Sequence, residues 1–308
     1  MRATVIGEVV IDRFIHPDGS VTDVPGGSAA NTAIALHRAG VDTSLRARFS
    51  RDAAGRALRT HSAAEGLDLA AAPDVDDPAS IVEIRLAADG QPAYVFHLAD
   101  AADWRWTSAE LATPLPPGTS LVLAGSLAAV LEPGASRIRS WLASLSERPL
   151  IAFDPNARPA AITDEAEAAR VRESVADWCR IADFIKVSDE DLRWLSPGVP
   201  ESEQAAAWSR GTGFVVMTRG GAGAAVYVNG SLVVDVPAES IEVVDTVGAG
   251  DTFMAWLIRG VLTACTERPL RDLAQDTAAL RDIVATAGRA AAITCSRRGC
   301  NPPRLSEV

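Results

Sequence analysis

The amino-acid sequence predicts an α/β fold in which helices cover both faces of a mainly parallel sheet. Short apolar runs alternate with amphipathic helical stretches along most of the chain, which is typical of βαβ units. Two pairs of segments with alternating apolar and polar residues also surround Asp-Gly turns, which is typical of antiparallel hairpins. We therefore expect one domain over residues 1–308 that carries a small antiparallel appendage.

The first third of the chain supplies both hairpins. Met1–Ile6 has the pattern of a short buried strand. A helix follows from about Gly26 to Ala39, and Gly40 stands where glycine commonly ends a helix. The hairpins are expected as insertions on either side of this helix, at about residues 12–25 and 80–99. Their strands and turns are Val9–Phe14 and Ser20–Val24 around Asp18-Gly19, and Val82–Leu86 and Tyr94–Leu98 around Asp89-Gly90.

The remainder of the chain alternates between strands and helices. The expected strands are Ser120–Ala124, Leu150–Phe153, Phe184–Val187, Phe214–Thr218 and Ile241–Asp245. The expected helices are Pro133–Ser146, Glu165–Ile181, Glu201–Arg210, Asp251–Leu262, Leu270–Gln275 and Ala278–Ala292. In an open parallel sheet, ligands bind at the carboxyl ends of the strands, so the residues after each strand are the candidates for function.

Composition and charge exclude several classes of protein. The 308 residues are 48% hydrophobic and 22% charged, which allows a sizeable core. A net charge of −11 disfavours nucleic acid or an anionic membrane as a partner. The longest apolar stretch, Leu121–Leu131, is too short to span a bilayer. None of the four cysteines forms a Cys-x-x-Cys pair, which disfavours a zinc ribbon or a thioredoxin motif. We interpret them as reduced, mostly buried thiols of a cytoplasmic protein.

The single lysine of the chain excludes two kinds of ATP site. Lys186 lies in an apolar segment with no glycine nearby, so the Walker-A loop of a P-loop ATPase is absent. The His-Arg-Asp and Asp-Phe-Gly motifs of protein kinases are absent as well.

The turn from Asp245 to Phe253 is the sharpest chemical feature. We expect a strand to end at Asp245 and a helix to begin near Gly250, with small residues between them. Free N–H groups at the positive end of a helix dipole suit a phosphate or a developing oxyanion. Asp251 in the first turn can accept a proton from a substrate hydroxyl. The plainer interpretation is that Asp251 caps the helix. Phe253 stands at the third glycine position, which disfavours a dinucleotide site and hence a nicotinamide dehydrogenase.

Two motifs give the chain a resemblance to a known family. Gly248-Ala249-Gly250-Asp251 and the segment Gly26–Ala33 resemble the two signatures of the ribokinase-like (PfkB) sugar kinases. The resemblance covers essentially the whole chain, and the hairpins are similar to the β-sheet lid of that family. It implies a ribokinase-like three-layer αβα fold and ATP-dependent phosphorylation of a sugar hydroxyl. Four further segments look most like bacterial fructokinases: Ala124–Leu127, Phe153–Pro159, Lys186–Asp191 and Ser296–Pro303.

The resemblance implies D-fructose as the acceptor and fructose 6-phosphate as the product. Ribose, 2-keto-3-deoxygluconate or a nucleoside are the alternatives within the same chemistry. A non-catalytic sugar or nucleotide sensor is the alternative from another class. The lid of this family also implies a homodimer through the lid as a possible assembly.

The resemblance also implies a role for individual residues. Asp251 would be the base, the N–H groups of Gly248, Ala249 and Gly250 would form the anion hole, and Arg158 would reach sugar or phosphate. The implied sugar contacts are Asp12, Gly26, Gly27, Asn31, Phe96, Arg158 and Asp251. The implied nucleotide contacts are Asn156, Lys186, Ser188, Asp191, Thr218, Gly220, Gly223, Gly248 and Gly250. Without the motifs, Asp12 would be interpreted as a turn residue and Arg158 as a surface arginine.

Two ions are implied as well. Mg²⁺ would accompany ATP, with Asp191 on the magnesium side. Ser188 and Asp191 depart from the Asn and Glu of the family motif, which weakens that assignment. A monovalent cation such as K⁺ would lie near Asp245, Val247, Thr294, Arg297 and Gly299.

Overall fold

The computed structural model describes residues 1–86, 92–98, 100–162 and 164–308. Its main sheet has eight strands in the order β14-β13-β12-β11-β10-β9-β1-β4. All neighbours from β12 to β4 are parallel, and β13 and β14 add an antiparallel edge, which confirms the mainly parallel sheet. The strands are β1 (Arg2–Ile6), β4 (Asp42–Arg46), β9 (Thr119–Gly125), β10 (Leu150–Asp154), β11 (Phe184–Ser188), β12 (Phe214–Thr218), β13 (Ala224–Val228) and β14 (Ser231–Val236).

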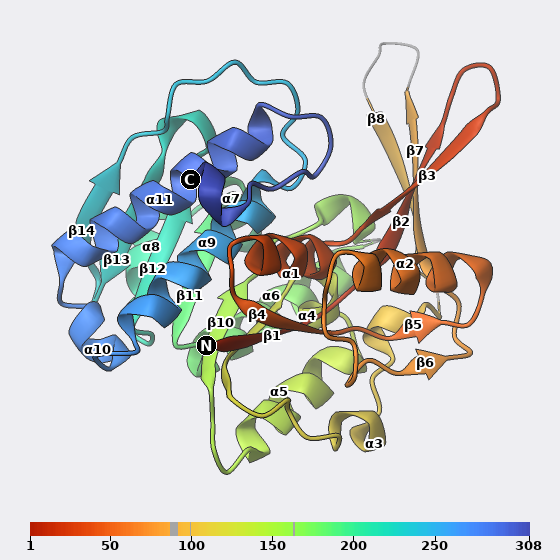
Figure 1. Cartoon of the computed structure of the whole chain (residues 1–308). Helices are drawn as coiled ribbons and strands as arrows, with labels where there is room; N and C mark the ends of the chain where they lie inside the picture. The colour runs from red at the N-terminus through yellow and green to blue at the C-terminus, as the bar shows by residue number, and fades with distance from the viewer. Residues whose placement is uncertain (87–91, 99, 163) are drawn as a thin grey trace.

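Helices cover both faces of this sheet, as the three layers in Figure 1 show. Alternate residues of β11 face opposite layers: Phe184 packs in one core cluster, and Ile185 and Val187 pack in the other. The first layer contains α1 (Ser28–Arg38), α2 (Ala53–Ala64), α9 (Ala249–Ala264), α10 (Leu270–Leu273) and α11 (Thr277–Cys295). The second contains α3 (Ser108–Leu111), α4 (Ser126–Val130), α5 (Gly134–Ser144), α6 (Glu165–Ile181), α7 (Asp189–Leu195) and α8 (Glu201–Trp208).

A separate four-stranded sheet, called the small sheet below, projects beside β1 and α1 (Figure 1). Its order is β3-β2-β7-β8, and both hairpins are antiparallel, as predicted. The sequence did not predict that β2 and β7 pair in parallel and so join the hairpins. The turn expected at Asp89-Gly90 lies outside the described residues. The strands are β2 (Val10–Ile15), β3 (Val21–Gly26), β7 (Ser80–Leu86) and β8 (Pro92–His97).

The small sheet leaves several apolar side chains exposed, among them Phe14, Val21, Val24 and Val95. A homodimer through this surface stays a prediction. Among the described residues, no helix combines the length and the apolar character needed to cross a bilayer.

The strand expected at Ile241–Asp245 is wrong. This segment lies outside regular structure, and Val243 and Val244 are 60% and 53% exposed. The N–H groups of Val244 and Asp245 instead donate to the carbonyl of Cys295 at the end of α11, at 2.9 and 3.1 Å. The hairpin β13–β14 occupies the sheet edge next to β12. A short run of β-branched residues has the same sequence pattern whether it is a strand or an irregular surface segment. Whether it becomes a strand depends on a neighbouring strand with which it can pair.

Candidate active site

Asp251 lies at the centre of the candidate site, in the first turn of α9, and is buried. Its Oδ1 accepts a hydrogen bond from Ser28 Oγ at 2.7 Å, and its Oδ2 accepts one from Asn31 Nδ2 at 3.0 Å. Ser28 and Asn31 both belong to the first turn of α1. The two sequence motifs therefore meet at one carboxylate, although they lie far apart in the chain. Two donors from one helix fix the orientation of this group.

The glycine turn before Asp251 is shaped by Gly248, which caps α9 with φ 76°. A side chain at Gly248 would place a Cβ only 2.2 Å from the sulfur of Cys300. The Ala249 N–H already donates to the Thr246 carbonyl at 3.2 Å. Within the described chain, the N–H groups of Gly248 and Gly250 have no such partner. The turn thus offers backbone donors at the positive end of a helix, where an anion binds well.

Gly248→Ala is expected to lower kcat about 100-fold, because it would displace a donor aimed at the charge that develops during the reaction. Alanine would strain the left-handed backbone and collide with Cys300. Gly118→Ala is the matched control, since Gly118 has φ 80° with no atom near its would-be Cβ. Gly118 directly precedes β9 and so lies at the amino end of that strand, whereas the candidate site lies at the carboxyl ends of the strands. Steady-state kinetics of both variants check the result; equal losses would contradict the role of the turn.

Lys186 lies beneath this turn and is only 3% exposed. Its Nζ donates to Asp154 Oδ2 at 3.0 Å and lies 3.3 Å from the place a Gly250 Cβ would take. Burial opposes the charge of Lys186, but the carboxylates of Asp154, Asp191 and Asp251 outweigh it and raise its pKa. Burial also raises the pKa of Asp154 to about 6, although Lys186 counteracts the rise. Lys186 thus pairs directly with Asp154, and its charge is favoured by the nearby carboxylates of Asp191 and Asp251 behind the glycine turn.

The candidate sugar contacts gather on the small sheet and at its base. The register aligns Asp12 with Val82 and Val82 with Phe96, so Asp12 and Phe96 share one face. Gly26 leaves room for Asp12, because a Cβ there would lie 2.4 Å from Asp12 Oδ2. Gly27 has φ 104°, and a Cβ there would lie 2.7 Å from the Glu8 carbonyl.

Arg158 lies near the same place. Its side chain is exposed and forms no hydrogen bond or ion pair within the described part of the chain. Burial raises the pKa of Asp12 to about 6, and the charge of Arg158 counteracts that rise. The guanidinium is thus close enough to act on Asp12 while its donors stay available to a ligand.

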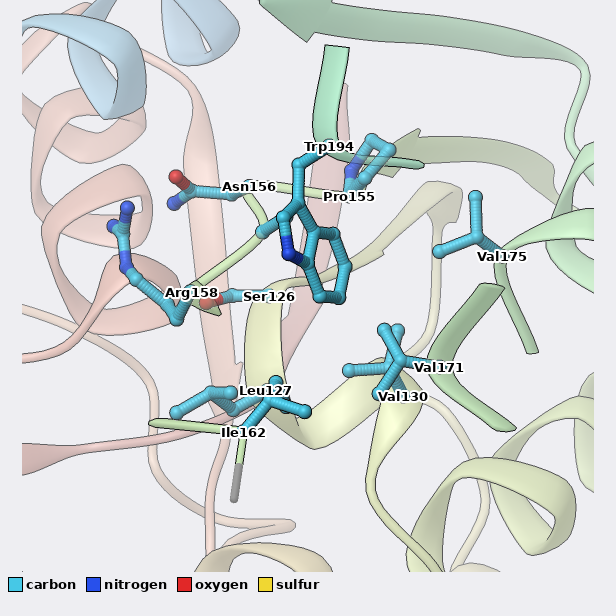
Figure 2. A pocket seen from close by; sticks show the side chains of 11 residues that line it. Ser126, Leu127, Val130, Pro155, Asn156, Arg158, Ile162, Val171, Val175 and Trp194 are labelled. Atoms are coloured by element: carbon cyan, nitrogen blue, oxygen red, sulfur yellow. The ribbon is translucent and has the colours of Figure 1, made fainter. Parts of the chain in front are cut away.

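The loop after β10 brings Asn156 next to Ser28 and Asp251. Asn156 has φ 38°, and its Nδ2 donates to Ser28 Oγ at 2.7 Å and lies 3.5 Å from Asp251 Oδ1. Figure 2 shows this loop at the rim of a small cavity, with the Arg158 side chain pointing away from Trp194 and the valines behind it. A non-glycine residue with positive φ is strained, and such strain is concentrated at functional sites.

The residues expected on the nucleotide side form local structure. Ser188 and Asp191 make a capping box that begins α7: Asp191 N donates to Ser188 Oγ at 3.0 Å, and Ser188 N donates to Asp191 Oδ2 at 3.2 Å. Asp191 Oδ1 accepts from Ala157 N at 2.9 Å. Thr218 is the neighbour of Ser188 in the sheet, and the turn after it contains Gly220 and Gly223, both with positive φ. These residues lie at or just after the carboxyl ends of the adjacent strands β11 and β12.

The residues expected near a monovalent cation are also neighbours. Asp245 Oδ2 accepts from Gly299 N at 2.9 Å, and Asp245 Oδ1 accepts from Val247 N at 3.1 Å. The carbonyl of Thr294 accepts from Arg297 N at 3.0 Å. Across the described residues, no group of three or more His, Cys, Asp or Glu side chains could hold a metal ion.

A comparison with known families decides the identity. The sequence profile of the pfkB family carbohydrate kinases matches residues 2–307. The chain belongs to this family. It is therefore a carbohydrate kinase, as the two motifs implied.

Three relatives are similar to this kinase over most of its length. A fructokinase of Rhizobium leguminosarum bv. trifolii is 33% identical over 76% of this chain and 70% of its own. An uncharacterized sugar kinase of Pyrococcus horikoshii, solved in complex with ATP, is 25% identical with a TM-score of 0.81, covering 100% of this chain and 97% of its own. Aminoimidazole riboside kinase of Salmonella enterica is 22% identical with a TM-score of 0.78, over 97% and 95% of the chains.

Sequence reasoning missed three residues of this kinase site. Ser28 lies inside the first motif, and its serine at a helix start is a signal that could have indicated a polar contact. Asp154 directly follows the predicted strand Leu150–Phe153, a position where carboxylates are candidates for function, and it is the last residue of β10. Cys300 carried no signal, because its place against Gly248 depends on how the C-terminal segment returns to the site.

Proposed function

We propose that this kinase transfers the γ-phosphoryl group of ATP to a hydroxyl of D-fructose and forms fructose 6-phosphate. The observation that carries the proposal is the Asp251 carboxylate, held by Ser28 and Asn31 beside backbone donors with no other partner. The fructokinase among its relatives supports fructose as the acceptor.

The proposed reaction needs one proton transfer and one displacement. Asp251 takes the proton of the sugar hydroxyl, and the oxygen attacks the γ-phosphorus. The new O–P bond forms while the bond to the β,γ-bridging oxygen breaks, and ADP leaves with the electron pair. The N–H groups of Gly248 and Gly250, with the Lys186 charge behind them, stabilise the charge on the transferring group.

The sugar would lie between the small sheet and α1. Asp12 and Asn31 offer an acceptor and an amide, Arg158 offers a fork of donors, and Phe96 offers apolar surface. A sugar hydroxyl both donates and accepts, so this mixed set suits it. The small sheet would cover the bound sugar and keep water from the γ-phosphate.

The nucleotide would lie along the ends of β11 and β12. We assign its phosphates to Asn156, Ser188 and the Thr218–Gly223 turn, while the buried Lys186, expected from the sequence as a nucleotide contact, acts on them through its charge. Asp191 already accepts two backbone N–H bonds, so it would hold a magnesium ion through water. When bound, Mg²⁺ neutralises charge on those phosphates. A K⁺ ion beside Asp245 and Gly299 would order the turn that leads to Gly248.

The test is ADP release with MgATP and a panel of acceptors: fructose, ribose, glucose, 2-keto-3-deoxygluconate, adenosine and aminoimidazole riboside. We expect fructose to give the highest kcat/KM. Preference for another acceptor would overturn fructose but keep the sugar kinase. No turnover on any acceptor, with ATP still bound, would favour a sensor.

The affinity for sugar should depend on pH through Asp12. Its pKa is about 6, raised by burial, so the accepting carboxylate is ionised above pH 6 and protonated below it. The KM for sugar should therefore rise as pH falls from 7 to 5, and the KM for ATP should change less. In Asp12→Asn, the KM for sugar should be high and nearly independent of pH. A wild-type dependence that persists in this variant would contradict the assignment.

A further inference from the structure

Two buried carboxylates lie at the root of the small sheet, outside the groups used above. Glu8 is 3% exposed and Asp103 is 1% exposed. Among the described residues, neither forms an ion pair. Burying a carboxylate without a cation destabilises the folded state, because the charge loses its hydration, and an apolar residue in the same space would avoid this loss. Their placement must therefore be explained by what they hold.

Asp103 joins the two strands through which the small sheet is attached. Its Oδ1 accepts from Val9 N at 2.8 Å, and its Oδ2 accepts from the hydroxyl of Ser80. Val9 directly precedes β2, and Ser80 is the first residue of β7. One carboxylate thus holds the starts of the two strands that pair in parallel at the middle of the small sheet.

Glu8 continues this connection toward the site. Its carboxylate accepts from Ala128 N at 3.3 Å, in the helix α4 that begins at Ser126. Ser126 has φ 53°, an uncommon value for serine, and it lines the cavity beside Asn156 and Arg158 (Figure 2). Hydrogen bonds therefore join Ser80 and Val9 to Asp103. Glu8, the residue before Val9, is joined in turn to Ala128, two residues after Ser126.

The charges around this pair are few. Burial raises the pKa of Glu8, and the Ser126 hydroxyl and Arg158 counteract it. Burial raises the pKa of Asp103 to about 7, and the Glu8 charge adds to the rise. Arg48 donates to the Ala102 carbonyl beside Asp103 but is paired with Asp77 and Glu110. Arg158 is the charge that faces Glu8 from the sugar side.

We propose that Glu8 and Asp103 form a hinge clamp that fixes the small sheet relative to the Ser126 turn and Arg158. They are positioning residues for the sugar, and this inference rests on the proposed function. Asp12 and Phe96 are carried by the clamped sheet, whereas Arg158 lies on the loop that follows β10 of the main sheet. Holding both sides in place before the sugar binds lowers the entropy that binding must otherwise lose.

The kinetic test uses Asp103→Ala, Ser80→Ala and Glu8→Gln. Removing a buried bond to a charged group should raise the KM for sugar about tenfold. The KM for ATP should change less than about twofold, because the nucleotide residues lie on other strands. ATP hydrolysis without sugar should rise relative to sugar phosphorylation. Leu142→Ala in α5 is the control for general destabilisation. It should lower the thermal midpoint but change neither the ratio of the two KM values nor the ratio of ATP hydrolysis to sugar phosphorylation. Equal changes in both KM values would overturn the clamp.

Hydrogen exchange gives a readout that needs no substrate. In Asp103→Ala and Ser80→Ala, amides of β2 and β7 should exchange faster, while those of β9–β12 keep their protection. Unchanged exchange in β2 and β7 would overturn the clamp even if the enzyme phosphorylates fructose. Faster exchange in the two variants, together with no turnover of any sugar by the wild-type protein, would support the clamp and overturn the proposed function.

Discussion

Asp251→Asn is expected to lower kcat about 1,000-fold or more while the protein still folds and binds ATP. General-base catalysis contributes a factor of about 10²–10⁴, and an amide cannot take the hydroxyl proton. The replacement has the same shape, and its oxygen can still accept from Ser28. Turnover with saturating sugar and MgATP measures the loss, and calorimetric ATP binding shows whether the nucleotide site survives.

The neighbours of Asp251 distinguish the base from its supports. Ser28→Ala keeps the carboxylate but removes its shortest side-chain hydrogen bond, so kcat should fall about tenfold. Asp272→Asn on α10 is a control carboxylate away from the site and should leave kcat unchanged. Wild-type turnover in Asp251→Asn, or a larger loss in Ser28→Ala than in Asp251→Asn, would show that another group takes the proton.

Local patterns predicted the elements that local forces determine. The helix expected at Glu165–Ile181 has those bounds in α6, because Asp164 caps it and acidic residues fill its first turn. The hairpin at Asp18-Gly19 formed for the same kind of reason, since the turn residues favour its geometry. Both signals lie within a few residues of the structure they predict.

Local sequence patterns did not predict which distant segments of the chain pair with each other. The exposed segment at Ile241–Asp245 and the strands β13 and β14 differ in which segment reaches the edge of β12, not in composition. The family resemblance, and not spacing, implied that Asn31 and Asp251 belong to one site, and their hydrogen bond was not predicted. The hydrogen bonds of Glu8 and Asp103 gave no signal at all, because each joins parts of the chain that only the fold brings together.

Lys186→Met is expected to destabilise the fold by about 3–5 kcal/mol, because it leaves buried carboxylates without their cation. Asp154 would lose the amine at 3.0 Å, and Asp191 and Asp251 would then repel it without compensation. Urea unfolding at pH 8 measures the loss. Arg180→Met is the control, since the Arg180 side chain is 72% exposed and its ion pair with Asp177 should contribute almost nothing.

The pH dependence of this loss identifies its cause. The pKa of Asp154 is about 6 and already lies above its unfolded value, and removing Lys186 should raise it further. A carboxyl group with a raised pKa favours the folded state at low pH, and this contribution disappears as pH rises through the folded-state pKa. The deficit of Lys186→Met should therefore be smaller at pH 5 than at pH 8. The double variant Lys186→Met/Asp154→Leu should recover part of the stability at pH 8, since it removes the carboxylate that Lys186 pairs with. A deficit that is equal at both pH values and persists in the double variant would mean that Lys186 stabilises the fold by packing, and the charge behind the glycine turn would lose its electrostatic role.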